Sequence, residues 1–365
     1  MSRLLVGVVC IAAVVVAPGW RERVLPQHSR APAPPTSTLS PSPPPPRKRG
    51  RRSLPPTTTA QSTLSTGVLD GCKHVYLDVG ANIGLQVRKL FEPERFPGAL
   101  IQPVFDRYFG ADVARRRAEV CAVGFEPNLD LTSRLAELGE RYTRLGWRTS
   151  FLKAAASTRD GNVTFYRDVS FVGARNNQWG ASMFASSFNQ ALGARAHRAA
   201  MTVPTIDLAE WMLAEVVNRR LPPEASSSES VQRPRVVMKL DIEGSEYVVL
   251  PHLLSKRVLK TARVAGRSSC PNCVLCSIDY MYMEVHPGAP GFDANLIGAA
   301  QNATRECGLE VTTLDDEVPL DPTSPYCRHL AASATGLAAT GKAAWYEVRA
   351  NLRANCYPVP PLPSV

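Results

Sequence analysis

The sequence predicts an α/β fold built on a doubly wound sheet, and three observations predict it. Short apolar segments alternate along the chain with segments of helical spacing, which is the order of β-α units. The chain after residue 69 is rich in Val, Leu, Ile and aromatic residues, which excludes wholesale disorder. Acidic residues follow three of the apolar segments, and ligands bind at the carboxyl ends of strands in such sheets.

The expected elements follow one another in the order strand, helix, strand. Strands are expected at residues 74–79, 120–125, 149–155, 236–240 and 280–285, with closing strands at 309–314 and 345–348. Helices are expected at residues 84–91, 129–144, 245–258 and 294–306. The pair Asp160-Gly161 favours a turn before a further extended segment at 163–166.

The charge of the chain is concentrated at its N-terminal end. Residues 1–69 hold nine basic residues and one acidic residue, a net charge of +8, out of +10 for the whole chain. Residues 70–365 hold 33 basic and 31 acidic residues and are close to neutral. A nucleic-acid-binding body usually needs a basic face, so we expect no nucleic-acid partner.

The N-terminal segment is interpreted as a targeting or membrane-anchoring segment followed by a disordered stem. Residues 4–17 are all apolar, which suits a short signal anchor in a thin bilayer. A cleaved signal peptide is an alternative, although Pro18 disfavours cleavage after Ala17, and the Arg- and Ser-rich composition leaves a plastid transit peptide open. We therefore expect an anchor or signal peptide at 1–20, a Pro/Ser/Thr-rich disordered stem at 21–69 and one folded domain at 70–365. The expected location is a membrane, with the domain in the lumen of the secretory pathway; a secreted protein is the other alternative.

The cysteines are compatible with an oxidising compartment. Nine occur, eight of them after the apolar run, and their pairing cannot be read from the sequence. The spacing Cys270-x2-Cys273-x2-Cys276 resembles a metal knuckle, but a fourth ligand is not evident. Two N-glycosylation sequons occur, at Asn162 and Asn302.

Two of the strand ends have the chemistry of a nucleoside site. Asp78 precedes a turn with the spacing Gly80-x-x-x-Gly84, where glycine lets the backbone approach a ligand closely. Glu126 ends the second strand, where acids bind ribose hydroxyls in Rossmann-type sites. A tight turn and a helix N-cap are the alternative interpretations of these two motifs.

The third strand end, residues 239–246, carries three carboxylates: Asp241, Glu243 and Glu246. Helix capping could account for Glu243 or Glu246, but it does not account for all three beside Asp241.

Together, the segments 78–84, 125–128, 239–246, 284–286 and 203–208 resemble the FkbM-type methyltransferase family. The resemblance covers roughly residues 73–315. It implies an S-adenosylmethionine-dependent methyltransferase on a Rossmann-like, seven-stranded class I methyltransferase sheet. It also implies O-methylation of a glycan or another hydroxylated acceptor. The residues that it implies for the cofactor are Asp78, Gly80, Asn82, Gly84, Glu126, Asn128 and Ala155. Three insertions, at about 91–117, 219–233 and 265–277, depart from the family pattern.

Methyl transfer to a hydroxyl favours a general base at the strand ends. His286 is the first candidate because an imidazole titrates near neutrality, and Asp241 is the second. Glu284 is expected to orient a neighbouring group. We assign no metal ligand, although a metal-assisted reaction using Asp241 and Glu243 stays open. A non-catalytic Rossmann-like binding or scaffold protein is the alternative function.

Overall fold

The chain divides into two units, Met1–Ser62 and Thr63–Val365, and the computed structural model describes part of the second. The described residues are 67–168, 181–185, 198–223, 233–261, 274–314 and 316. Within these ranges, no helix combines the length and the apolar character needed to cross a membrane. The expected anchor, nearly all of the expected stem and the expected strand at 345–348 lie outside the described residues.

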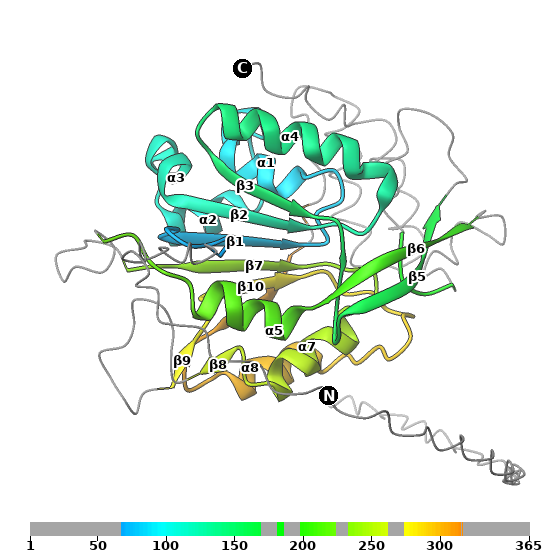
Figure 1. The fold of residues 1–365 in the computed structure, drawn as a ribbon. Helices are drawn as coiled ribbons and strands as arrows, with labels where there is room; N and C mark the ends of the chain where they lie inside the picture. The colour runs from blue at the N-terminus through cyan, green and yellow to red at the C-terminus, as the bar shows by residue number, and fades with distance from the viewer. Residues whose placement is uncertain are drawn as a thin grey trace, which may run out of the picture. The chain divides into compact units, whose positions relative to one another are not determined.

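Six parallel strands form the central sheet, in the order β11-β10-β7-β1-β2-β3 (Figure 1). Their bounds are β1 His74–Val79, β2 Val120–Phe125, β3 Arg148–Leu152, β7 Val236–Leu240, β10 Tyr280–Met283 and β11 Glu310–Thr313. The chain builds outward from β1 to β3 and then returns to place β7 on the other side of β1. The strand order therefore reverses between β1 and β7, and ligands bind at this point in doubly wound sheets.

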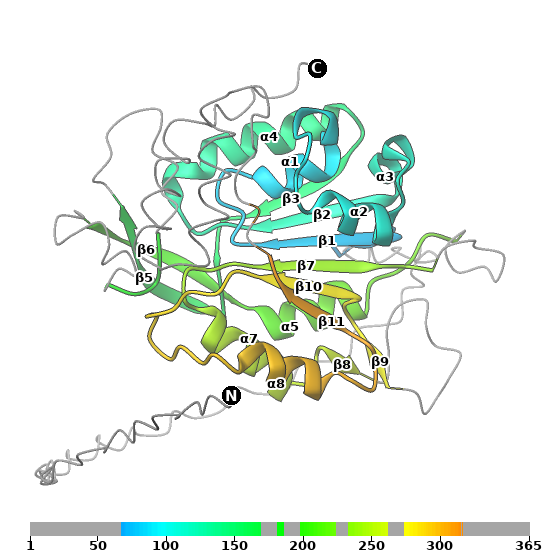
Figure 2. The same cartoon turned by 180° about the vertical axis from the view of Figure 1, so that it is seen from behind.

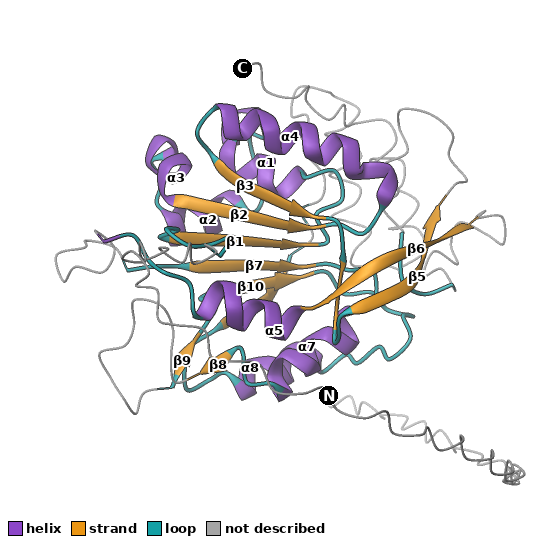
Figure 3. Ribbon diagram, in the orientation of Figure 1, coloured by secondary structure: helices purple, strands orange, loops and turns teal. Residues whose placement is uncertain are grey.

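Helices cover both faces of the central sheet (Figure 3). One face packs against α1, α2 and α4, and the other packs against α5, α7 and α8. Their bounds are α1 Leu85–Phe91, α2 Gln102–Phe109, α4 Thr132–Arg144, α5 Leu208–Met212, α7 Glu246–Ser255 and α8 Leu296–Ala303. Successive side chains of β1 enter opposite cores, Tyr76 the first and Leu77 the second. Every residue of β1, β2 and β7 is buried, as expected when both faces are covered.

A second, three-stranded sheet in the order β4-β6-β5 lies at the carboxyl ends of the central strands (Figure 1). Its bounds are β4 Ala155–Ser157, β5 Gly161–Asp168 and β6 Arg198–Asp207, with β5 and β6 antiparallel. The prediction of a single strand at 149–155 was wrong, because this segment is divided between β3 of the central sheet and β4 of the second sheet. The carbonyl of Leu152 accepts the N–H of Glu126 at 3.0 Å as β3 ends, and β4 then pairs with β6.

The strands expected at 74–79, 120–125 and 236–240 are confirmed at the same residues. The first helix begins at Leu85, because Gly84 before it has a left-handed backbone with φ of 78°. The insertion at 91–117, which departs from the family pattern, contains α2 and most of α3, Val113–Glu119. Six of the seven expected central strands lie in the described residues. Figure 2 shows β11 beside β10 at one edge of this sheet.

Two disulfides connect the described elements. Cys72 before β1 is bonded to Cys121 in β2, and Cys276 in β9 is bonded to Cys307 before β11. Strand β9, Leu275–Cys276, pairs with β8, Lys260–Thr261. Closing loops with sequence separations of 49 and 31 residues stabilises a fold by roughly 3–4 kcal/mol each in the chain-entropy model. Because Cys276 is bonded to Cys307, it is not a thiolate ligand of the three-cysteine motif, whose other members lie outside the described residues.

Candidate functional site

The turn after β1 has a backbone that requires glycine. Gly80 has φ of 91°, and a Cβ at this position would lie 1.7 Å from the backbone oxygen of Asp241. No side chain fits between the ends of β1 and β7 at this distance. Asn82, two residues later, also has a left-handed backbone, with φ of 47°. The chain therefore turns sharply at the carboxyl end of the sheet.

Glu126 holds this turn against the end of β2. Its Oε2 accepts the backbone N–H of Asn82 at 2.7 Å, and its Oε1 accepts the N–H of Asn128 at 2.8 Å. The residue is only 7% exposed, so these charge-assisted bonds fix the orientation of its carboxylate. An ionised carboxylate has about four lone-pair positions and can still accept hydroxyl donors.

A buried lysine contacts residues at the ends of both β1 and β7. Lys239 of β7 donates from Nζ to the backbone oxygen of Gly80 at 2.8 Å. The same Nζ lies 3.0 Å from Oδ2 of Asp241 and 3.8 Å from Oδ1 of Asp78, which is fully buried. Burial raises the pKa of Asp241, and Lys239 opposes that shift. Lys239 thus holds the ends of β1 and β7 together electrostatically.

Four carboxylates surround the buried imidazole of His286. Its Nε2 lies 3.7 Å from Asp241, 3.5 Å from Glu243 and 3.9 Å from Glu284, and its Nδ1 lies 3.3 Å from Glu246. Burial lowers the pKa of His286, but the carboxylates, with Glu243 foremost, raise it by more. The net effect of these interactions is a pKa of His286 above the ordinary value for histidine.

The loop between β7 and α7 positions two of these carboxylates differently. Glu246 is fully buried and accepts the backbone N–H groups of Ile242 at 2.5 Å and Gly244 at 2.8 Å. Glu243 has a left-handed backbone with φ of 54° and a side chain that is 25% exposed. Burial raises the pKa of Glu243 well above its usual range, and nearby carboxylates add to the shift. Glu246 therefore shapes the loop, whereas Glu243 faces the space above it.

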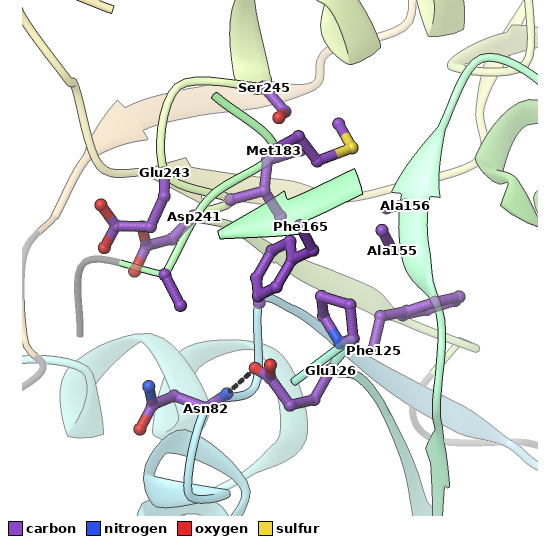
Figure 4. A pocket seen from close by; sticks show the side chains of 14 residues that line it. Asn82, Phe125, Glu126, Ala155, Ala156, Phe165, Met183, Asp241, Glu243 and Ser245 are labelled. Atoms are coloured by element: carbon purple, nitrogen blue, oxygen red, sulfur yellow. Dashed lines mark hydrogen bonds between the residues drawn. The ribbon is translucent and has the colours of Figure 1, made fainter. Parts of the chain in front are cut away.

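A pocket that is partly open to solvent lies over these strand ends. Figure 4 shows the carboxylates of Asp241 and Glu243 together on one side, with Glu126 bonded to Asn82 on another. Side chains from the second sheet and its connections, including Phe165 of β5, complete the wall. The lining residues are Gly80, Asn82, Phe125, Glu126, Pro127, Ala155, Ala156, Phe165, Ala181, Met183, Asp241, Ile242, Glu243 and Ser245.

The sequence of the chain matches one protein-family model. A model described as the methyltransferase FkbM domain matches residues 78–311, more than half of the chain. The chain belongs to the FkbM methyltransferase family. The resemblance inferred from the sequence motifs is thereby confirmed. No curated protein and no solved structure gives a significant match.

The match to the FkbM domain extends from the end of β1 into β11, so it includes all the strand ends described above. Four of the residues implied for the cofactor line the pocket: Gly80, Asn82, Glu126 and Ala155. The other three are not among its lining residues. Asp78 is buried beside Lys239, and Asn128 accepts the N–H of Asp130 through its side chain at 3.1 Å. Gly84 packs so closely that an added Cβ would lie 2.7 Å from the side chain of Leu138.

The three residues expected for catalysis in this FkbM domain lie together. Asp241 and Glu284 are both within 4 Å of the His286 ring. His286 was chosen as a base because an ordinary imidazole has a pKa near neutrality. In the structure the surrounding carboxylates raise the pKa of His286 above that value. Lys239 was not proposed as a site residue, although a lysine inside an apolar strand was a usable signal. Phe165 was also missed, and no motif in the sequence marks it.

Proposed function

We propose that this FkbM methyltransferase transfers a methyl group from S-adenosylmethionine to a hydroxyl group of a glycan or another hydroxylated molecule. The observation that carries the proposal is the pocket over the strand ends. One side of it has the glycine turn at Gly80 and the carboxylate of Glu126, which suit a nucleoside. The other side has Asp241 and Glu243, which suit the reacting hydroxyl.

The residues of the pocket fit S-adenosylmethionine. Glu126 lines the pocket at the end of β2, where acids bind ribose hydroxyls in sheets of this type, and its carboxylate has further lone pairs that can accept them. Ala155 and Ala156 are small, apolar residues that line the same pocket as Glu126, and they suit an adenine ring. Asp241 and Glu243 suit the positive charge of a sulfonium. S-adenosylmethionine supplies a methyl group that this sulfonium has already activated.

The protein side chains then have two tasks, alignment and proton removal. Holding the acceptor oxygen in line with the methyl carbon contributes roughly 7–11 kcal/mol in well-oriented reactions. The hydroxyl loses its proton to the cluster of Asp241, Glu243 and His286. A carboxylate with a raised pKa is a stronger base than an ordinary one, and the pKa values of Asp241 and Glu243 are both raised. Phe165 and Met183 exclude water from one side of the pocket.

The experiment that tests the proposal is a Glu126→Gln substitution. Glutamine keeps the size of the side chain but removes the negative charge that receives two ribose hydroxyls. Each charge-assisted hydrogen bond is worth roughly 1.5–3 kcal/mol, so we expect the Kd for S-adenosylmethionine to rise at least about tenfold. Isothermal titration calorimetry on the full chain measures it.

The matched control is Glu140→Gln, which makes the same chemical change at an exposed position of α4. It should leave the Kd unchanged. An unchanged Kd in Glu126→Gln would contradict the assignment of the ribose site. Wild-type protein that binds S-adenosylmethionine but methylates no member of a panel of monosaccharides and extracted glycans would favour a non-catalytic binding protein.

We further propose that the protein is a single-pass membrane protein with its FkbM domain in the lumen of the secretory pathway. Two disulfides support an oxidising compartment, because they are rare in the cytosol. Asn162 of β5 and Asn302 of α8 are both exposed, as glycosylation requires.

In cells, we expect the protein to stay in the membrane pellet after a carbonate wash. Its electrophoretic mobility should increase on treatment with an N-glycosidase, and this increase should disappear in the double variant Asn162→Gln and Asn302→Gln. A soluble product that begins near Pro18, or import into a plastid, would contradict the proposed topology.

A further inference from the structure

We propose that Asp241, Glu243 and His286 form a binding site for one divalent cation of the Mg²⁺ and Mn²⁺ class. One ligand atom of each side chain, two carboxylate oxygens and one imidazole nitrogen, lies within 4.8 Å of the others. The three come from two neighbouring strand ends, since Asp241 and Glu243 follow β7 and His286 follows β10. Figure 4 shows the two carboxylates next to each other at the pocket.

A buried carboxylate oxygen gives the second, independent indication. The side chain of Asp241 is 7% exposed, and its Oδ2 pairs with Lys239 at 3.0 Å. Its Oδ1 is buried and has no hydrogen-bond partner within the described part of the chain. That oxygen faces Nε2 of His286 at 3.7 Å, beyond hydrogen-bond distance. Buried carboxylate oxygens are almost always bonded to a donor or a metal, and this one faces two further potential ligands.

The charge around the site also favours a cation. Four carboxylates lie within 4 Å of the His286 ring, and Lys239 contacts one of them. Among the described groups, this leaves more carboxylates than cationic partners at a buried position. Buried charges are costly unless they are paired or coordinate a metal. A divalent cation between Asp241 and Glu243 reduces the excess of negative charge.

The donor set indicates which cations fit. Carboxylate oxygens suit Mg²⁺ and Mn²⁺, and one imidazole nitrogen is compatible with Mn²⁺. Asp241 and Glu243 line the pocket, so further coordination positions would face water or a ligand oxygen. If the proposed function holds, that oxygen is the acceptor hydroxyl, and the cation would lower its pKa. Cation binding itself does not depend on methyl transfer.

The test is a titration of the full chain with Mn²⁺ after treatment with EDTA, with S-adenosylmethionine and acceptor both absent. The electron paramagnetic resonance signal of free Mn²⁺ measures binding. We expect one bound Mn²⁺ per chain, displaced by excess Mg²⁺. Because each side chain is a direct ligand, Glu243→Gln and His286→Ala should each weaken binding at least about tenfold, the lower limit seen for outer-shell substitutions. Electron spin echo modulation from a coordinated nitrogen should be present in the wild type and absent in His286→Ala.

The control is Glu210→Gln, on α5, where an exposed carboxylate pairs with Lys256 at 3.3 Å. It removes one acidic group without touching the site and should bind Mn²⁺ like the wild type. The proposal is overturned if the wild type binds no Mn²⁺, if both site variants keep wild-type affinity, or if the nitrogen modulation persists in His286→Ala. Circular dichroism shows which variants are folded. Failure of methyl transfer would leave this result intact, because the measurement contains neither donor nor acceptor.

Discussion

Gly80→Ala is expected to abolish tight binding of S-adenosylmethionine and to destabilise the domain. The added Cβ would lie 1.7 Å from the backbone oxygen of Asp241, so the ends of β1 and β7 would have to separate. The left-handed backbone at φ of 91° adds roughly 1–3 kcal/mol of strain for a residue with a Cβ. The same movement would displace Asn82 from Glu126, and with it the wall of the pocket.

Calorimetry and thermal unfolding measure the two effects. We expect no saturable S-adenosylmethionine binding and a fall in Tm of about 5–10 °C, at roughly 2–4 °C per kcal/mol for a domain of this size. The matched control is Gly98→Ala, where φ is 80° but an added Cβ would meet nothing within 4 Å. If the two variants behave alike, the contact with Asp241 does not constrain the turn.

His286→Ala is expected to lower turnover by about 10²–10⁴-fold and to leave the Kd for S-adenosylmethionine unchanged. His286 lies beside the carboxylates of Asp241 and Glu243, on the side of the pocket that we propose for the acceptor, whereas Glu126 of the proposed ribose site lies at the end of β2. Removing a group that takes part in proton transfer typically costs a factor of this size. Transfer of a radiolabelled methyl group to the best acceptor of the panel measures turnover, and calorimetry measures the Kd.

The matched control is His252→Ala, which removes a histidine that pairs with a carboxylate away from the pocket, at 2.9 Å from Asp207. It should reduce turnover by only a few fold. A folded His286→Ala with normal turnover would remove His286 from the mechanism. Loss of the folded state would show that its role is structural, and His286→Gln would then test whether a neutral donor restores folding without turnover.

Part of the fold could be predicted because its determinants are local. Strands buried on both faces consist of continuous apolar residues, so β1, β2 and β7 were evident from composition alone. Acids at the ends of parallel strands must lie at one edge of the sheet, which brought Glu126 and Asp241 into the expected site.

Strand pairing was not evident from local pattern. The segment 149–155 was expected as one strand, but β4 leaves the central sheet to pair with β6, which begins more than 40 residues later in the chain. Phe165, which lines the pocket, lies on β5, and β5 pairs with this same strand β6. Helix α2 was not predicted for the same reason: its apolar side chains are buried by contact with the central sheet, and a local pattern does not show that contact.

Residue type and short-range spacing are enough to predict the α/β class, the family and the acids at the strand ends. Tertiary structure alone decided the electrostatic state of the site. The pKa of His286 is the sum of interactions with carboxylates from two strand ends that lie some 40 residues apart in the chain. Asp241 Oδ1, which has no hydrogen-bond partner among the described residues, likewise depends on where Lys239 and His286 lie around it. Coulomb interactions and desolvation act through space, so a linear pattern names the charged groups but does not determine their protonation.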